Sequence, residues 1–113
     1  MTTIDDWTNG EWSNGVQIDQ LGALESLFVR TRHTIYEIVI TSPEAGDVLV
    51  RGGARFPTFT QARVSGSTTG GNLLKCCGIY PGLRIEFQQK TRRVLTSTVL
   101  AIAVAADASE HEH

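Results

Sequence analysis

Two glycine-bearing stretches of the chain combine residue types that can bind anions. Residues 51–55 place an arginine on each side of Gly-Gly-Ala, and residues 65–71 read Ser-Gly-Ser-Thr-Thr-Gly-Gly. Guanidinium groups hold phosphate through paired hydrogen bonds, and hydroxyls beside exposed loop N–H groups can form an anion-binding nest. The candidate ligand-binding residues are Arg51, Arg55, Ser65, Ser67 and Gly70.

A plainer interpretation of both stretches stays open. Glycine is also the residue that turns require wherever φ is positive, and neither stretch is a P-loop, because no Lys-Ser/Thr pair follows at the required spacing. A shared anion site also makes a geometric demand. The segment between the stretches, residues 56–64, would span about 30 Å if fully extended, so the two loops meet only if the chain bends back.

Nucleophilic and metal chemistry find little support. His33 stands outside any nucleophile–base motif, so it is interpreted as an ordinary surface or strand-edge histidine. The adjacent Cys76 and Cys77 have no second pair at zinc-ligand spacing. Neighbouring side chains of a strand point to opposite faces, so we expect these thiols to be reduced and on opposite faces, one toward the core. The chain is predicted not to be an enzyme, and no cofactor or metal is expected.

Charge is distributed unevenly along the chain. Residues 1–50 carry a net charge of −6, residues 51–93 a net of +7 and residues 94–113 a net of −3, which gives −2 for the whole. The basic middle favours an anionic small molecule as partner, or an acidic segment of this or another chain. Nucleic acid is disfavoured, because a pI near 5.9 is low for such a protein and few aromatic residues are left for stacking on bases.

Length and composition predict one soluble domain. A chain of 113 residues has room for one core without disulfide or metal support. The first six residues are acidic and polar, unlike a secretory signal. The longest apolar run, residues 99–106, is much shorter than a membrane span. Together with the reduced thiols, these features predict a cytoplasmic protein with no membrane partner.

The predicted fold is mostly β, a small antiparallel β-barrel of about six strands with one short helix near the N-terminus. Turn signals recur every eight to twelve residues, as in small barrels and sandwiches. The clearest strand has Leu83, Ile85 and Phe87 facing inward. The helix is expected over residues 20–28, where leucines and a phenylalanine share a face at helical spacing. Another strand is expected over residues 73–79.

The chain divides into three segments on this interpretation. Residues 1–19 form an acidic, Trp-bearing segment, residues 20–106 the β-barrel domain and residues 107–113 a disordered tail. Within the first segment, residues 6–15 repeat the pattern acid, tryptophan, hydroxyl, Asn-Gly, which suits either two turns or a docking segment that engages arginines through cation–π contacts. The last strand, residues 94–105, is apolar on both faces, which predicts cover from a second copy or from the N-terminal segment.

Motifs along residues 27–104 resemble a group of short bacterial hypothetical proteins without an assigned activity. They include Thr31-Arg32-His33, Val50-Arg51-Gly52-Gly53, Phe56-Pro57 and Leu83-Arg84-x-Glu86-Phe87. This resemblance implies a shared all-β fold and adds no chemistry.

A second resemblance concerns PilZ domains, six-stranded barrels that bind cyclic di-GMP. Ser65-x-Ser67-x-x-Gly70 is similar to their Asp/Asn-x-Ser-x-x-Gly motif, with Ser65 in place of the acid or amide. Arg51-x-x-x-Arg55 has the spacing of their arginine motif but lies closer to the serines. This resemblance implies a cyclic-dinucleotide receptor.

Three functions are therefore consistent with the sequence. The leading one is a non-enzymatic β-barrel binding module that prefers an anionic small-molecule ligand. The alternatives are a structural or protein-interaction module that acts as a homodimer, and a degenerate PilZ-like receptor for a cyclic dinucleotide.

Overall fold

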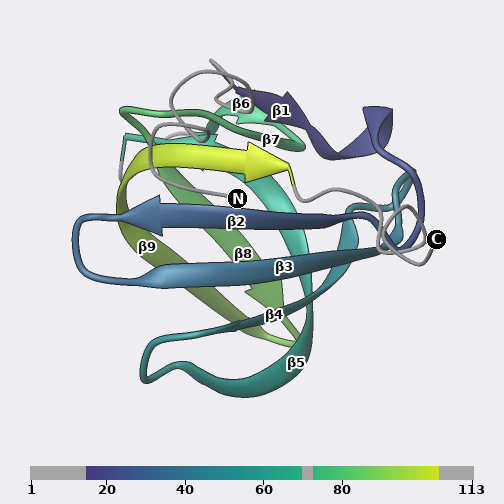
Figure 1. Ribbon diagram of the computed structural model, residues 1–113, viewed down its shortest axis with the longest axis horizontal. Coiled ribbons are helices and arrows are strands. Elements are labelled where there is room, and N and C mark those ends of the chain that lie inside the picture. Colours follow the sequence, from purple (N-terminus) through teal and green to yellow (C-terminus); the bar gives the residue numbers. More distant parts are fainter. Residues whose placement is uncertain (1–14, 70–72, 105–113) are drawn as a thin grey trace, which may run out of the picture.

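The computed structural model describes residues 15–69 and 73–104, without the side chains of Leu73 and Leu74, and its architecture is mostly β (Figure 1). The Trp repeat before Gly15, the candidate Gly70 and the predicted tail lie outside the described residues. In chain order, the elements are β1 (Val16–Gln17), the short 3-10 helix η2 (Ile18–Gln20), β2 (Ser26–Thr31), β3 (Ile35–Ser42), β4 (Asp47–Gly52), β5 (Phe56–Thr68), β6 (Leu73–Cys76), β7 (Gly78–Ile79), β8 (Arg84–Gln89) and β9 (Arg92–Val104).

The main sheet has the order β4-β3-β2-β9-β8-β5-β6, and all of its pairings are antiparallel. β5 also pairs with β4, so the series from β4 to β5 is joined at its two ends. Most neighbours in this series are also neighbours in sequence, as expected where short turns join antiparallel strands. Two pairings are exceptions: β5 pairs with β8 across the intervening β6 and β7, and β2 pairs with β9, which joins strands from opposite ends of the described chain.

Two long strands, β5 and β9, each pair with one neighbour along their first part and with another along their last part. The first part of β5 pairs with β4 and the second part with β8, with Arg63 opposite both Asp47 and Gln88. Likewise, β9 pairs with β8 through its first part and with β2 through its last residues. Irregular register interrupts most of these pairings, and such bulges bend strands and increase their twist. Figure 1 shows the curvature of β5 plainly.

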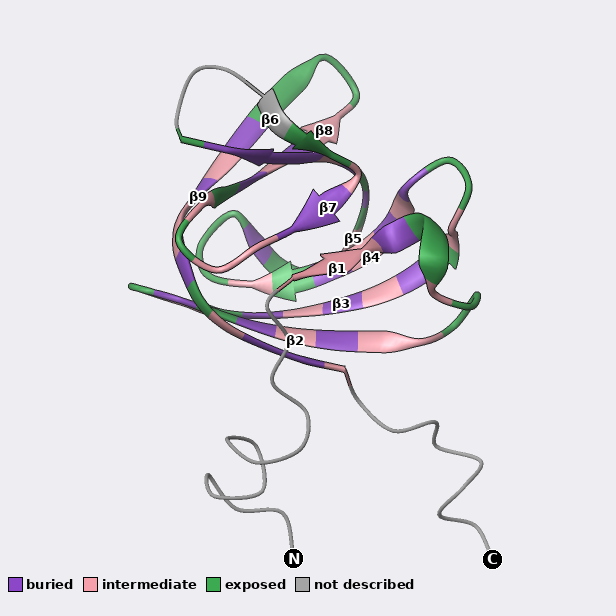
Figure 2. Cartoon of the chain, turned by 90° about the horizontal axis from the view of Figure 1, so that it is seen from above, coloured by how far each residue is buried: buried purple, intermediate pink, exposed green. Residues whose placement is uncertain are grey.

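Period-two patterning explains why these segments are strands. Ile85 and Phe87 of β8 are fully buried and Arg84 is exposed, which confirms two of the three predicted inward positions; Leu83 lies before the strand and is only partly buried. β3 and β4 alternate in the same way, and the alternation is visible as stripes along the strands in Figure 2. β-branched residues dominate the buried positions, which suits a pleated surface that is covered on one face.

The predicted helix over residues 20–28 is wrong. Only Ile18–Gln20 form a single 3-10 turn, and β2 begins at Ser26. Leu24, which the helical pattern placed on a buried face, is 76% exposed and has a φ of 71°. The segment follows the period-two pattern of a strand instead. Leu27 and Val29 are fully buried, and their backbone pairs on both sides, with β3 and with β9.

The core is centred on three aromatic rings. Phe56 and Phe87 are fully buried, with ring centroids 5.5 Å apart in an edge-to-face arrangement, and Tyr36 lies 6.2 Å from Phe87. Such contacts add to the stabilisation from burial itself. Burial raises the pKa of Tyr36, against the smaller opposing effects of a hydrogen bond with Thr34 and the charge of Arg55. The Tyr36 hydroxyl therefore stays neutral well into the alkaline range.

A small second layer closes one end of the core. β1 pairs with β7, and Ile18 of η2 and Ile79 of β7 are both fully buried in the same cluster as the main sheet. Figure 1 shows β1, β6 and β7 together at this end of the molecule. No helix in the described ranges has the length and apolarity to cross a membrane.

Candidate functional site

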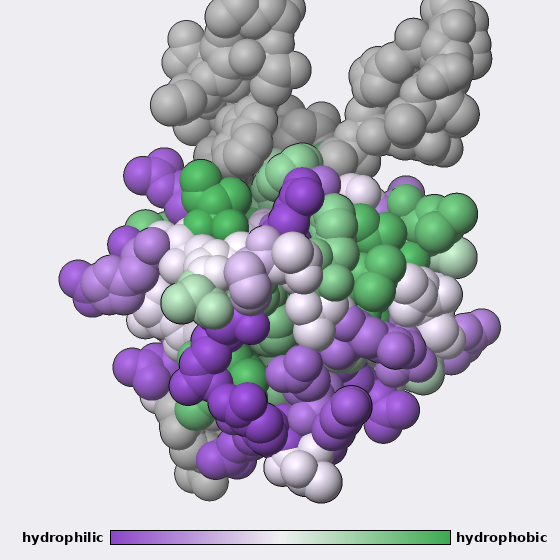
Figure 3. Space-filling model, turned by 90° about the horizontal axis from the view of Figure 1, so that it is seen from below, coloured by the Kyte–Doolittle hydropathy of each residue, from purple (hydrophilic) through white to green (hydrophobic). Residues whose placement is uncertain are grey.

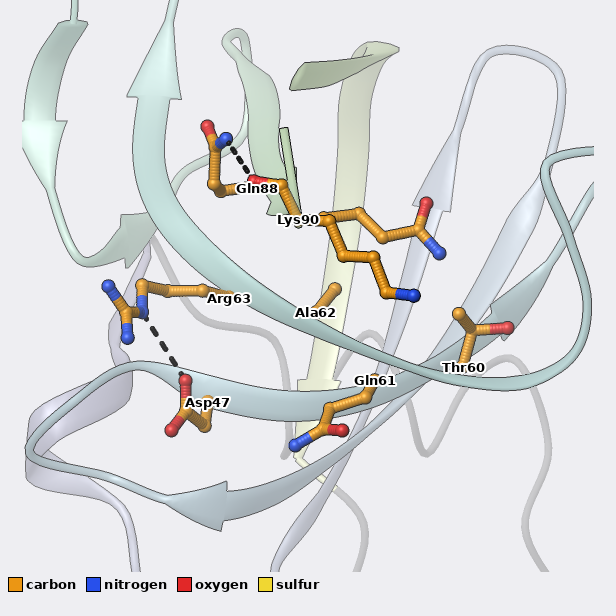
Figure 4. Close-up of a pocket in the computed structure, with 8 residues that line it drawn as sticks. Asp47, Thr60, Gln61, Ala62, Arg63, Gln88 and Lys90 are labelled. Carbon is orange, nitrogen blue, oxygen red and sulfur yellow. Dashed lines mark hydrogen bonds and ion pairs between the residues drawn. The ribbon is translucent and has the colours of Figure 1, made fainter. Parts of the chain in front are cut away.

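A polar groove of about 520 Å³ runs beside β5 under the turn between β8 and β9 (Figure 4). It is lined by Asp47, Thr60, Gln61, Ala62, Arg63, Gln88, Gln89 and Lys90. Glutamine amides, a hydroxyl and three charged groups can all form hydrogen bonds with a ligand. On the side of β4 and β5, hydrophilic side chains cover much of the surface, and apolar side chains gather toward one margin (Figure 3).

The groove exists because β5 extends beyond the hairpin of β8 and β9. Arg63 is the first residue of β5 with a partner in β8, and the hairpin turns back directly after Gln89. Val64 donates its N–H to the Gly46 carbonyl on the β4 side. Backbone groups alternate in direction along a strand, so those of Gln61 point away from β4. Within the described chain no strand lies opposite them, and they border the groove.

The two cations of the groove differ in their partners. The Nε atom of Arg63 lies 3.3 Å from Oδ1 of Asp47, and Arg63 remains largely exposed. Lys90, by contrast, has no acidic group within ion-pair distance among residues 15–69 and 73–104. An exposed pair such as Arg63 with Asp47 stabilises the fold little, but it fixes the direction of the guanidinium. Within the part of the chain that the structure describes, the groove therefore holds one cation paired with Asp47 and one cation, Lys90, without an acidic partner.

The position of Lys90 is set by the hairpin turn. Gln89 pairs with Arg92, so the turn contains only Lys90 and Thr91, and Lys90 has a φ of 54°. Two-residue hairpins require positive φ, which usually selects glycine or asparagine. The Nε2 amide of Gln88 donates a 3.0 Å hydrogen bond to the Lys90 carbonyl and helps to hold this conformation. A lysine at such a position carries backbone strain, a feature that is concentrated at functional sites.

The arginines predicted from the sequence lie outside this groove. Arg51, on the outer face of β4, pairs with Oε1 of Glu37 at 2.5 Å, and its guanidinium carbon lies 4.3 Å from the centre of the Phe59 ring. Arg55 is exposed in the turn that follows β4. Arg51 is thus already engaged on both sides, by a carboxylate and an aromatic ring.

The predicted serines belong to a strand, and the expected polar loop over residues 65–71 begins only after Thr68. Ser67 is fully buried: its hydroxyl donates to the Gly78 carbonyl at 2.8 Å and accepts from the Tyr80 N–H at 3.2 Å. Through its hydrogen bond to Gly78, this hydroxyl connects β5 with β7. Ser65 is half-buried, and its carbonyl accepts the N–H of Cys77.

The expected convergence of the arginines and serines is wrong. Arg55 directly precedes β5, whereas Ser67 is the last residue but one of that 13-residue strand. The arginine turn therefore lies at one end of β5 and Ser67 near the other end. Ser67 is also fully buried, so its hydroxyl is not available at the surface. Gly70 falls outside the described residues.

The cysteines also differ from expectation. The strand predicted over residues 73–79 is divided at Cys77, where β6 ends and a turn leads to β7. Cys77 has a φ of 61°, so the two side chains do not alternate as in a strand. Instead, the Sγ atoms of Cys76 and Cys77 lie 3.2 Å apart, with Cys76 exposed and Cys77 partly exposed. Both thiols are free, and neither belongs to the core.

His33 lies outside the groove. His33 is exposed in the turn between β2 and β3. Among residues 15–69 and 73–104, no three histidine, cysteine or acidic side chains gather as metal ligands would.

Only part of the groove had a sequence signal. Residues 90–93, Lys-Thr-Arg-Arg, indicate a turn; the observed turn consists of Lys90 and Thr91, and Arg92 and Arg93 already belong to β9. The mismatch in length between β5 and the β8–β9 hairpin left no signal, because it depends on register between distant segments. Comparison with known proteins finds no match to this chain among family models, curated proteins or solved structures.

Proposed function

We propose that this protein is a non-enzymatic binding module built on a six-stranded β-barrel, and that its ligand is an anionic small molecule held in the groove beside β5. The observation that carries the proposal is Lys90. A strained turn holds this cation at the groove, and no acid in the described chain neutralises it. An unpaired cation beside an open hydrogen-bonding surface favours an anion from solution.

The other groups of the groove suit the same ligand. Arg63 is oriented by Asp47 and offers its remaining N–H donors. The backbone N–H of Gln61 borders the groove, and no strand among residues 15–69 and 73–104 lies opposite it. The three glutamine amides can adapt to a ligand as donors or acceptors, which is useful where a phosphate or carboxylate is attached to a polar body. The barrel positions these groups, and no reaction is required of them.

Replacing Lys90 with glutamine is expected to weaken binding of a polyanion probe by at least about tenfold. A hydrogen bond to a charged group contributes about 1.5–3 kcal/mol, and about 1.4 kcal/mol corresponds to tenfold in affinity. Tripolyphosphate is a suitable probe, titrated into the isotope-labelled protein while amide shifts are followed by NMR. The Gln61 and Lys90 amides should shift most. Raising the salt concentration should weaken binding, because the groove is open to solvent.

Lys75→Gln is the matched control for this experiment. Lys75 is an exposed cation in β6, opposite Ser67 in the other half of β5, so its loss changes the net charge equally without touching the groove. Affinity in this variant should stay within about twofold of the original protein, since only screened long-range charge is lost. Equal weakening by both substitutions, or shifts spread over the basic surface, would mean that the groove is not the site.

A second candidate function, self-association, is favoured by two exposed apolar side chains. Leu100 is 51% exposed and Ile35 is 59% exposed. Arg30 pairs with both Ile35 and Ala101, and Leu100 is the extra residue of the bulge beside Ala101. The two side chains therefore lie near each other across β2. A second copy could cover them, which the sequence pattern of the last strand also favours.

The double substitution Ile35→Lys with Leu100→Lys is expected to convert a dimer into a monomer, because two charges would be buried at the contact. Sedimentation velocity over a range of concentrations measures this change. Leu24→Lys is the control, since Leu24 is more exposed and belongs to the loop before β2. A protein that is already monomeric at high concentration would eliminate this candidate function.

A further inference from the structure

The adjacent thiols of Cys76 and Cys77 lie closer together than a regular strand allows. In an extended strand, neighbouring side chains point to opposite faces. Here the left-handed conformation of Cys77, with a φ of 61°, brings its Sγ atom to 3.2 Å from that of Cys76. A sulfur–sulfur bond measures about 2.05 Å, so the two sulfur atoms must approach each other by about a further 1 Å to form one.

Backbone contacts hold Cys77 in this conformation from both sides. Its N–H donates to the Ser65 carbonyl at 2.9 Å, and its carbonyl accepts the N–H of Ile18 at 2.9 Å. On the strand beneath, a Cβ atom added to Gly66 would come within 3.0 Å of the Cys77 nitrogen and still closer to the Lys75 carbonyl oxygen. Only a glycine at position 66 permits this close approach. The turn is therefore held by β5 on one side and by Ile18 of η2 on the other.

The two thiols differ in their surroundings, which sets an order of reaction. Cys76 is exposed, whereas Cys77 is partly covered. The hydrogen bond between the two sulfurs, assisted by partial burial and by the charge of Asp19, raises the pKa of Cys77. Cys77 therefore keeps its proton to a higher pH than an ordinary cysteine. Cys76 is the nucleophile that solvent and small molecules can reach. Thiolates are the reacting species in disulfide exchange.

We propose that Cys76 and Cys77 form a redox-active dithiol site, which a low-molecular-weight disulfide such as oxidised glutathione converts into a disulfide between neighbouring residues. The Cys76 thiolate attacks one sulfur of glutathione disulfide, forms a mixed disulfide and releases one glutathione thiolate. Cys77 then loses its proton to solvent, and its sulfur attacks the Cys76 sulfur and expels the second glutathione. The protein loses two electrons and two protons, and one glutathione disulfide becomes two glutathione thiols.

The resulting bond should be easily reversed. Adjacent Cα atoms are about 3.8 Å apart, below the usual range of about 4.4–6.8 Å for disulfides. Strained disulfides are more readily reduced than structural ones, and exposed, strained examples are those that exchange with small thiols. The site is therefore suited to reversible modification rather than to holding the fold together. It is independent of the ligand groove, which lies along the other half of β5.

The test is oxidation of the full chain in glutathione buffers, followed by acid quench, alkylation and intact-mass measurement. The original protein should become lighter by two hydrogen atoms, should remain uncrosslinked to other chains, and should return to the dithiol when reduced glutathione is in excess. Cys77→Ser should stop at a stable mixed disulfide on Cys76, which is the matched control for the second step. Cys76→Ser should react more slowly at Cys77.

A trivalent arsenical, phenylarsine oxide, provides a separate reading of the geometry, because it is captured by two thiols close to each other. The original protein should bind it at least about tenfold more tightly than either serine variant, a difference that one chelating contact accounts for. The proposal is overturned if the original protein accumulates a mixed glutathione disulfide as Cys77→Ser does. It is equally overturned if neither thiol reacts, or if the arsenical does not distinguish the dithiol from the single thiols.

Discussion

Replacing Phe87 with alanine is expected to lower the free energy of unfolding by about 3–5 kcal/mol, the usual range for a fully buried phenylalanine. Phe87 has no exposed surface and contacts the rings of both Phe56 and Tyr36. The cavity left behind borders two rigid rings and paired strands, which limits how far the core can collapse. Urea denaturation with linear extrapolation measures the loss.

Phe59→Ala is the matched control for this prediction. The Phe59 ring lies on the outer face, is 38% exposed and contacts the guanidinium of Arg51 at 4.3 Å. Its removal should cost about 1 kcal/mol or less, the worth of an exposed cation–π contact with partial burial. Equal losses from the two phenylalanines would show that the aromatic cluster is not the centre of the core.

Gly66→Ala is expected to produce the largest loss of stability among the glycine substitutions. Gly66 has a φ of 148°, and an added Cβ atom would lie 2.2 Å from the carbonyl oxygen of Lys75, a backbone atom in a paired strand. The backbone conformation costs about 1–3 kcal/mol for a residue other than glycine, and the overlap costs about 1–3 kcal/mol more. β6 would have to move away from β5 to relieve it.

Gly82→Ala separates the two contributions. Gly82 also has a positive φ, 89°, but an added Cβ atom would meet nothing within 4 Å. This variant should show only the conformational cost, so thermal or urea unfolding should place it between the original protein and Gly66→Ala. If Gly82→Ala were as damaging as Gly66→Ala, the close approach of β6 to β5 would not be a determinant of stability.

The strands could be predicted where side chains alternate cleanly, and less well where two patterns compete. The inward positions Ile85 and Phe87 followed from the sequence because one face of β8 is apolar and the other is polar. The helix predicted over residues 20–28 was wrong because the spacing of the leucines there also fits a helix. The pairing of Leu27 and Val29 with two other strands decided the outcome, and such tertiary contacts override local propensity.

The candidate site was harder to predict, because it depends on strand lengths and on single backbone conformations. The basic residues of the middle segment are real surface features, but the strand between Arg55 and Ser67 carries them apart. The approach of Cys77 to Cys76 results from a left-handed residue, which no periodic pattern records. In hindsight, a glycine within β5 was the nearest signal, since isolated glycines in strands often mark a close approach of another backbone.

The antiparallel pairing of β2 with β9 has a consequence for the order of folding. Hairpins such as β3 with β4 and β8 with β9 close short loops, for which the entropy cost is small. The contact between Leu27 and Val104 instead joins residues near the two ends of the described chain. The entropy cost of closing this long loop is offset only after the intervening strands have assembled. Non-local pairings of this kind slow folding. Closure of β9 onto β2 is therefore expected to limit the rate at which this chain reaches its native state.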